Sequence, residues 1–320
     1  MSLETSPLTI ADRTFDSRLF LGTGKFASPE SMRDALASSG TQVVTVALRR
    51  ADLTGKNDPF ANILEFIDPG RYLILPNTSG AMNADEAGRM LDASLAKPGL
   101  VAQVVPSPIT LFADATIRRL IAEGFLGQLL AVESRIRGDF LDSESPMHWR
   151  QNAELSGNNI MAMGIYYEAI VRWVGRATNV MARAKTFTAQ RLNESGEPQP
   201  VGVPEHLDVV ADLKCGAQLH MQQSAVTALL QDDAIYLFGS EGTLRLTSDR
   251  LFGGRKGDEQ LTEIPITAEE RGEWQVESDF AAAVRGEREV THTTFADGVH
   301  YMEFTDAVAR SIRSGRLEAV

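Results

Sequence analysis

The sequence has 320 residues, 43 of them acidic and 31 basic, and a formal net charge of −12. With 43% hydrophobic and 23% charged residues it has enough material for a packed core, which excludes a disordered chain. The acidic balance excludes a nucleic-acid-binding protein, because no basic stripe exists to neutralise phosphates. No apolar run approaches the roughly 18 residues of a membrane span, and the single cysteine, Cys215, fits a reducing compartment. These features predict a cytoplasmic protein that acts on a small molecule.

The first hundred residues alternate between strand and helix patterns. Helix starts are marked by Ser28-Pro29, Asp58-Pro59 and Asn83 with Glu86. Strands separated by helices imply right-handed crossovers and therefore a parallel sheet. We predict an α/β segment, either a partial barrel or a Rossmann-like sheet. Its strands are expected at residues 18–21, 42–48, 72–75 and 100–105.

Beyond residue 105 the pattern changes to that of an α+β domain. Between Thr178 and Leu246 several β-rich stretches follow one another, mostly without room for helices, which predicts a large, mostly antiparallel sheet. We therefore predict two domains, residues 1–99 and 100–320, with a surface loop at residues 194–205. Helices are expected up to residue 123 and at 161–175, 276–285 and 298–314, with a strand at 129–137.

A glycine-rich turn, Gly22-Thr23-Gly24-Lys25-Phe26-Ala27, follows the first strand and opens a helix. It fits the G-x-G-x-x-G/A pattern, in which glycines let the backbone approach a phosphate at a helix N-terminus. Gly22, Gly24 and Lys25 are therefore candidate cofactor-binding residues. The second strand ends in Arg49-Arg50 in place of the acidic residue typical of NAD sites, and arginine suits the 2′-phosphate of NADP. A plain tight turn is the alternative interpretation.

Four ordered motifs occupy residues 8 to about 87. They include Ser17–Lys25 (SRLFLGTGK), Val44–Arg50 (VTVALRR), Asn62–Pro69 (NILEFIDP) and Leu75–Gly80 (LPNTSG). Together they resemble thiazole synthase, an enzyme of thiamine biosynthesis. The resemblance implies a (β/α)8 barrel that uses a deoxyxylulose phosphate, dehydroglycine and a sulfur-carrier protein, and a lysine that forms an imine with the sugar. The strand expected at residues 100–105 contains no lysine, and about three of eight barrel strands are present.

A second set of motifs runs from Gly88 to the C-terminus. It includes Gly88–Ala93 (GRMLDA), Val101–Pro106 (VAQVVP), Ile121–Gly127 (IAEGFLG), Phe238–Arg245 (FGSEGTLR) and Asp279–Gly286 (DFAAAVRG). Residues 88–320 thereby resemble the glucose–fructose oxidoreductase/inositol dehydrogenase (Gfo/Idh/MocA) family. The resemblance implies an NAD- or NADP-dependent oxidoreductase whose substrate domain carries an oligomer-forming sheet. The chain is predicted to fuse this part to the N-terminal part of a thiazole synthase.

The usual catalytic side chains of the Gfo/Idh/MocA family are replaced in this sequence. Its Glu-Lys-Pro motif has no counterpart before residue 83, and alignment on Gly164 puts Ala162 and Tyr166 in place of its aspartate and histidine. Tyr166 and Glu168 are the candidate catalytic residues. A tyrosine, with an ordinary pKa near ~10, needs a cationic neighbour to act as an acid. The alternative is that both residues only pack at a domain surface.

Further polar and aromatic residues complete the candidate site. Trp149, Arg150 and Asn159 are candidate substrate-binding residues, because arginine offers a planar fork of donors to a polar ligand. The alternative is a tryptophan and an arginine exposed on a loop. The histidines show no metal-binding spacing, so no metal is expected, although His206 and His220 are expected on neighbouring strands. Cys215 is expected to be buried in a strand.

Three functions are compatible with these observations. The first is a Gfo/Idh/MocA-like oxidoreductase of a sugar-like or polyol substrate with NAD or NADP, impaired because the Rossmann half and the usual catalytic residues are missing. The second is a thiazole-synthase-like enzyme. Of the three functions, only this one would involve a sulfur-carrier protein. The third is a catalytically silent homodimer or higher homo-oligomer formed through the C-terminal sheet.

Overall fold

The computed structural model describes residues 7–10, 13–24, 26, 28–47, 63–77, 81–96, 98–99, 101–193, 196–290 and 292–320. The chain divides into two compact units, Met1–Ala81 and Met82–Val320, and each has a hydrophobic core of its own. This boundary precedes the expected division at residues 99 and 100. The reason is that α2 (Ala84–Leu95) packs against α7 (Phe295–Ser314) and so belongs to the second unit.

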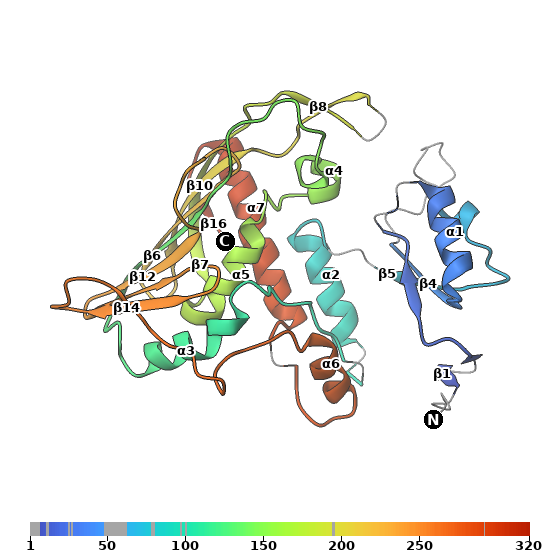
Figure 1. The fold of residues 1–320 in the computed structure, drawn as a ribbon, viewed down its shortest axis with the longest axis horizontal. Helices are drawn as coiled ribbons and strands as arrows, with labels where there is room; N and C mark the ends of the chain where they lie inside the picture. Colours follow the sequence, from blue (N-terminus) through green and yellow to red (C-terminus); the bar gives the residue numbers. More distant parts are fainter. Residues whose placement is uncertain are drawn as a thin grey trace. The chain divides into compact units, whose positions relative to one another are not determined.

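The first unit is built on a parallel sheet with the order β3-β4-β5 among its described strands (Figure 1). Phe20 pairs with Val43, and Val43 pairs with Leu73. The predicted parallel βα segment is therefore present. A consecutive order occurs both in barrels and in one half of a Rossmann-like sheet, so it does not distinguish the two predicted architectures. The elements are β1 (Leu8–Ile10), β2 (Arg13–Phe15), β3 (Phe20–Gly22), α1 (Pro29–Ser39), β4 (Val43–Ala47), the 3₁₀ turn η2 (Ile63–Phe66) and β5 (Leu73–Asn77).

Helix α1 begins and ends where the sequence predicts. The hydroxyl of Ser28 accepts a hydrogen bond from Ser31 N at 3.2 Å, and Gly40 ends the helix in the left-handed region with φ 68°. Met32 and Leu36 are buried on the sheet in the same cluster as Val44. The core of the first unit therefore lies between α1 and one face of its sheet.

The second unit contains a sheet of nine described strands in the order β15-β14-β13-β12-β6-β11-β10-β7-β16 (Figure 1). All neighbouring pairs are antiparallel except β6 and β11, so the predicted large, mostly antiparallel sheet is present. Val132 and Leu219 from the sheet share a core cluster with Met163 of α5 and Phe304 of α7, so these helices cover one face. The strands are β6 (Leu129–Ile136), β7 (Ala177–Lys185), β10 (His206–Leu213), β11 (Gln218–Ser224), β12 (Ala234–Gly239), β13 (Gly242–Leu246), β14 (Leu251–Arg255), β15 (Thr262–Glu263) and β16 (Glu318–Ala319).

The helices of the second unit follow the predicted positions closely. The helix expected at 161–175 is α5, which begins two residues after Met161, a residue with a positive φ of 52°. The bounds are α3 (Leu111–Ala122), the 3₁₀ turn η3 (Trp149–Gln151), α4 (Ala153–Ser156), α5 (Met163–Val174), α6 (Val276–Val284) and α7.

Three local predictions are wrong. Residues 101–108 form no strand, because their backbone pairs with a loop, as in the bond from Val104 N to Thr293 O at 3.0 Å. Cys215 is exposed, since it lies in the turn that joins β10 to β11. The stretch expected to be a loop at 194–205 contains β9 (Pro198–Pro200), which pairs with β8 (Gln190–Leu192).

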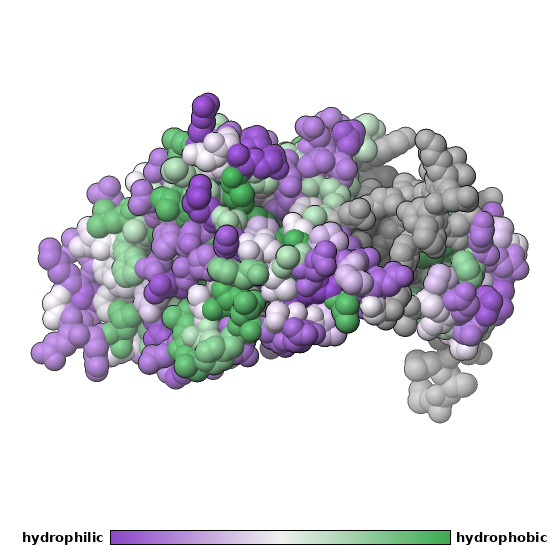
Figure 2. All heavy atoms as spheres, turned by 90° about the horizontal axis from the view of Figure 1, so that it is seen from above, coloured by the Kyte–Doolittle hydropathy of each residue, from purple (hydrophilic) through white to green (hydrophobic). Residues whose placement is uncertain are grey.

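The surface mixes polar and hydrophobic side chains. On the face shown in Figure 2, hydrophobic patches are set among hydrophilic residues. Several large hydrophobic side chains are exposed in the loop before η3 and around β8, including Phe140 at 68% and Leu192 at 51%. None of the helices that the structure describes combines the length and apolar character required to cross a bilayer.

Candidate functional site

Tyr166 lies in the first turn of α5, whose start is held by Asn159. Asn159 Oδ1 accepts a hydrogen bond from Gly164 N at 2.9 Å, so this candidate residue is bonded to the first turn of the helix that carries Tyr166. Tyr166 is half-buried, and no hydrogen bond joins its hydroxyl to another residue in the described part of the chain. Burial, with a smaller effect from Asp233, raises the pKa of Tyr166 to about 12. The hydroxyl therefore stays protonated at neutral pH and can donate a hydrogen bond to a ligand.

Glu168, one residue beyond Tyr167, is buried in a polar network. Its Oε1 accepts from Ser107 N at 2.8 Å and from Thr293 Oγ1 at 2.9 Å, and it lies 3.4 Å from Arg172 Nη1. Burial raises the pKa of Glu168 and outweighs the donors that favour the charged form. These contacts give Glu168 a structural role, and its catalytic role stays a prediction.

The same network joins α5 to α3 through Arg172. Its Nε lies 3.1 Å from Asp114 Oδ2, and Nη2 donates to Thr110 Oγ1 at 2.9 Å. Asp114 Oδ1 accepts from Trp173 Nε1 at 2.8 Å. Because every one of these groups is nearly excluded from solvent, the network holds the helix that carries Tyr166 in one position.

Trp149 and Arg150 lie in η3, and they stack on each other. The Arg150 guanidinium carbon lies 4.3 Å from the centroid of the Trp149 ring, and Trp149 is 43% exposed. His148 Nδ1 accepts from Arg150 N at 3.2 Å, while Gln151 Oε1 accepts from His148 N at 2.9 Å, which fixes the turn. The pair presents a flat, positively charged surface, and its binding of a substrate stays a prediction.

The glycine-rich turn of the first unit lies between β3 and α1. Lys25 lies outside the described residues. Thr23 N donates to Thr45 O at 3.2 Å, and a side chain at Gly22 would meet Thr45 only at an ordinary 3.6 Å. At the start of α1, Ser31 N already donates to the Ser28 hydroxyl. Pro29 has no N–H, and Glu30 adds negative charge. The described residues therefore do not fit a pyrophosphate at this helix N-terminus.

His206 and His220 lie on the neighbouring strands β10 and β11, as expected. Asp208 stands between them, with His206 Nε2 at 2.9 Å and His220 Nε2 at 3.7 Å from its carboxylate. The sequence did not reveal this group, because it depends on the register of two strands. Among the residues the structure describes, no cluster suited to a metal ion is present.

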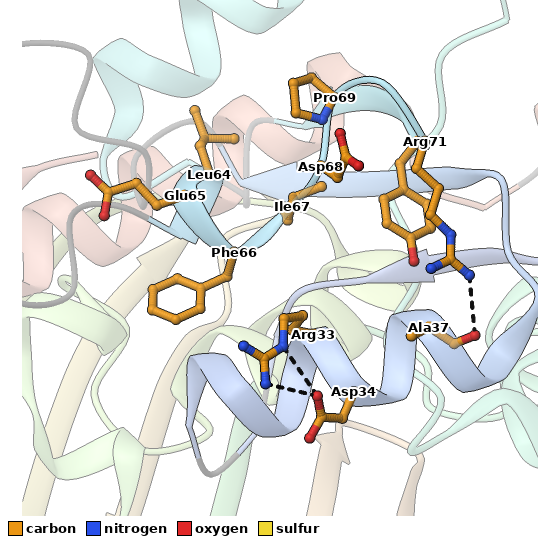
Figure 3. A pocket seen from close by; sticks show the side chains of 11 residues that line it. Arg33, Asp34, Ala37, Leu64, Glu65, Phe66, Ile67, Asp68, Pro69 and Arg71 are labelled. Carbon is orange, nitrogen blue, oxygen red and sulfur yellow. Dashed lines mark hydrogen bonds and ion pairs between the residues drawn. The ribbon is translucent and has the colours of Figure 1, made fainter.

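A cavity of about 670 Å³ lies in the first unit, between α1 and residues 64–72 (Figure 3). Its arginines already have partners. Arg33 is paired with Asp34 at 3.0 Å, and Arg71 Nη2 donates to the carbonyl of Ala37 at 3.4 Å (Figure 3). Both arginines of this cavity are therefore already paired, so the cavity is not a good anion-binding site.

Comparison with known proteins finds the same two families as the motifs, but the thiazole synthase match extends past the expected end at about residue 87. The family model described as thiazole biosynthesis protein ThiG matches residues 9–125, and the model of the GFO/IDH/MocA C-terminal domain matches residues 115–245. The chain is therefore similar to one family in its N-terminal part and to another in the part that follows. Both predicted resemblances are thereby confirmed, and the two matches meet within α3 and the residues that follow it.

The relatives of the N-terminal part are thiazole synthases. Thiazole synthase 1 of Syntrophotalea carbinolica is 48% identical over 127 residues, which is 37% of this chain and 48% of the relative. The thiazole synthase of Syntrophobacter fumaroxidans is 48% identical over 128 residues, or 38% of this chain and 49% of the relative. The chain spans about half the length of these curated relatives.

The similar solved structures are oxidoreductases. An oxidoreductase domain protein from Kribbella flavida has a TM-score of 0.67 at 21% identity, covering 90% of this chain and 82% of that one. An NAD binding oxidoreductase from Klebsiella pneumoniae gives 0.67 at 18% identity with the same coverage. Levoglucosan dehydrogenase in complex with NADH and L-sorbose gives 0.65 at 19% identity, also over 90% and 82%. At these identities the likeness shows the fold alone.

Proposed function

We propose that this chain is a Gfo/Idh/MocA-like oxidoreductase of a sugar-like or polyol substrate, with NAD or NADP as its cofactor and with impaired turnover. The observation that carries the proposal is Tyr166, a half-buried hydroxyl without a described partner at the start of α5. The match to the GFO/IDH/MocA C-terminal domain includes this position. Levoglucosan dehydrogenase, whose complex contains NADH and L-sorbose, supports the substrate class.

Tyr166 is suited to holding a substrate hydroxyl rather than deprotonating it. With a pKa raised to about 12 it remains neutral, so it donates a hydrogen bond to a substrate oxygen but removes no proton at pH 7. The residue aligned with the family's aspartate is Ala162, which has no ionisable group. The chain therefore binds the substrate without a strong general base, which accounts for impaired turnover.

The second cause of impairment is weak cofactor binding. A bound nicotinamide would accept or supply the hydride. The start of α1, however, has a serine cap, a proline and an acidic residue, which together disfavour the binding of a cofactor phosphate there. Titration with NADH and NADPH, followed by fluorescence, tests the oxidoreductase function: we expect saturable binding that is weaker than micromolar, and no binding up to millimolar concentration would contradict the function. Saturable micromolar binding would contradict the impairment, and turnover of polyols that survives Tyr166→Phe would contradict the role of Tyr166.

The N-terminal match favours a second candidate, a thiazole-synthase-like enzyme that uses a sulfur-carrier protein. Residues 9–125 contain only three lysines that could form an imine, Lys25, Lys56 and Lys97, and all lie outside the described residues. Borohydride trapping with a ketose phosphate, followed by mass spectrometry, tests this directly. An adduct lost in one Lys→Ala variant would identify the imine lysine, and the absence of any adduct ends the hypothesis.

The open face of the second unit's sheet supports a third proposal, a homodimer or higher homo-oligomer in the cytoplasm. Met181 and Val210 alternate with buried residues and are 47% and 41% exposed, and Tyr236 stacks on Phe238 at 5.4 Å on the same face. Size-exclusion chromatography with light scattering should show an oligomer that Val210→Glu converts to a monomer. A monomeric wild-type protein would contradict this proposal.

A further inference from the structure

Two histidines share one carboxylate on the open face of the large sheet, opposite the face that α5 and α7 cover. His206 and Asp208 alternate along β10 with the core residues Leu207 and Val209, and His220 lies on the same face of β11. Asp208 Oδ2 is 2.9 Å from His206 Nε2, and Asp208 Oδ1 is 3.7 Å from His220 Nε2. The two histidine side chains are 24% and 42% exposed, so both can exchange protons with solvent.

Hydrogen bonds hold this group together and keep Asp208 ionised. His206 Nδ1 lies 3.0 Å from Ser224 Oγ, and Gln222 Nε2 donates to Asp208 Oδ1 at 3.0 Å. Burial alone would raise the pKa of Asp208, but the hydrogen bonds from Gln222 and His206 hold it below its ordinary value. Asp208 therefore stays charged near pH ~6.5, where histidine side chains ordinarily titrate. A single carboxylate can balance only one of two protonated histidines.

The other charges around the histidines balance one another at neutral pH. Three bases and three acids of the described chain lie on neighbouring positions of this face, namely Arg135, Arg183 and Lys185, and Glu133, Asp208 and Asp212. Glu133 lies opposite His220 on the neighbouring strand, and its Oε1 is 3.5 Å from Arg135 Nε. Just beyond β6, Arg137 and Asp233 form a further pair, with 3.9 Å between Nε and Oδ1. Protonation of both histidines therefore leaves two positive charges per copy without a matching carboxylate.

The open face is large enough to hold a second copy of the chain. Its seven consecutive strands from β14 to β7 contain five to nine residues each. At about 4.8 Å between strands and about 3.3 Å per residue, the face measures roughly 35 by 20 Å, or roughly 700 Å² before side-chain relief is counted. A standard interface buries about 800 Å² of accessible surface on each partner. The exposed side chains of Met181 and Val210 add apolar contact area next to His220.

We propose that protonation of His206 and His220 separates two copies of this chain that associate through this face. Association removes water from the face, and burial of uncompensated imidazolium charges is costly, so the neutral form associates and the protonated form dissociates. The whole chain has a net charge of −12, so a general loss of negative charge in acid would instead strengthen association. The direction of the pH effect therefore distinguishes the histidines from the overall charge. The switch rests on the proposed homo-oligomer and is independent of the proposed oxidoreductase activity.

Sedimentation velocity of the full chain at pH 7.5 and pH 5.5, at one ionic strength, tests this switch. The dissociation constant of the wild type should rise at least about tenfold at pH 5.5, which is about one unit below the pKa of an ordinary histidine. The double variant His206→Gln/His220→Gln has no titrating imidazole in this group, so its dissociation constant should stay within about twofold. His300→Gln is the matched control and should keep the wild-type response, because His300 Nδ1 also lies near a carboxylate, 2.7 Å from Glu303 Oε2, but on α7.

Several results would overturn the switch. A dissociation constant that is unchanged or smaller at pH 5.5 overturns the switch alone and leaves the homo-oligomer in place, whereas a wild type that is monomeric at pH 7.5 overturns both. An acid response that the double variant keeps in full would assign the effect to other groups. Loss of circular dichroism at pH 5.5 would mean acid unfolding instead of dissociation. If the double variant does not fold, His220→Gln replaces it and should reduce the response, and a full response there would overturn the proposal.

Discussion

Arg172 of α5 forms an ion pair with Asp114 of α3, with 3.1 Å between Nε and Oδ2. Both side chains are below 10% exposed, so removal of one charge leaves the other buried without its partner. Asp114→Ala also removes the acceptor of Trp173 Nε1. We expect it to lower the free energy of unfolding of the second unit by about 3–5 kcal/mol, measured by denaturant titration.

The control for this variant is an exposed ion pair in the same unit. Arg285 and Glu287 are 2.5 Å apart and more than half exposed, so Arg285→Ala should leave stability unchanged within error. Equal effects of Asp114→Ala and Arg285→Ala would show that the buried network does not stabilise α5.

Glu205 should make the second unit sensitive to acid. Burial alone would raise the pKa of Glu205, but the N–H groups of Thr188 and Phe187 and the Arg191 guanidinium together hold it below the ordinary 4.5. The unfolded chain therefore binds the proton first as pH falls. This contribution is complete above about pH 4.5 and is lost as pH drops through the lower pKa of the folded state.

Glu205→Gln tests that linkage. The variant should be less stable at pH 7, and its free energy of unfolding should fall less steeply below pH 4.5 than that of the wild type. Parallel pH profiles for the two proteins would show that another group controls acid unfolding.

The adjacent tyrosines of α5 should respond differently to loss of their hydroxyl groups. Tyr167 accepts a hydrogen bond from Ala177 N at 3.0 Å in the core, so Tyr167→Phe should cost about 1–3 kcal/mol. Tyr166→Phe should change stability by less than about 0.5 kcal/mol but weaken polyol binding about tenfold. Thermal unfolding measures the stability of both variants, and calorimetric titration measures their polyol binding. Unchanged polyol binding by Tyr166→Phe would show that Tyr166 is only a packing residue.

Two glycines of the second unit should have opposite effects when replaced by alanine. A Cβ at Gly88, inside α2, meets no atom within 4 Å, so Gly88→Ala should stabilise the unit by about 0.5–1 kcal/mol. A Cβ at Gly239 would lie 2.0 Å from Leu126 O, so Gly239→Ala should cost about 3 kcal/mol or more. The midpoints of denaturant unfolding test both predictions. A lower midpoint for Gly88→Ala than for the wild type would contradict the first.

The features that the sequence predicted well are those set by nearby residues. Asn83 Oδ1 accepts from Glu86 N at 2.9 Å, as the capping pattern indicates, whereas Glu86 Oε2 accepts at 2.8 Å from Met82 N, one residue before the N-cap. By contrast, the strand expected at residues 100–105 is absent because β propensity does not supply a partner strand. The apolar run is instead bound to the loop before α7 through Thr293.

The sequence predicted which secondary-structure element carries the candidate residues, but not which residues surround them. The sequence placed Tyr166 and Glu168 at the start of a helix; Tyr166 lies in the first turn of α5, whereas Glu168 lies in its second turn. It did not reveal that Glu168 bonds to Thr293, 125 residues away, or that Asp208 lies between histidines of two strands. Such contacts depend on strand register and helix packing, which involve residues far apart in the chain.

Asp306 of α7 joins two segments at the N-terminal edge of the second unit. Its Oδ2 accepts from Ala84 N at 2.8 Å, and its Oδ1 accepts from Asn158 Nδ2 at 2.7 Å. The first turn of α2 is thus anchored by residues that follow it in the chain. A recombination event upstream of residue 82 would leave both bonds intact. In evolutionary terms, the second unit can accept a new N-terminal partner without a change in the contacts that hold α2.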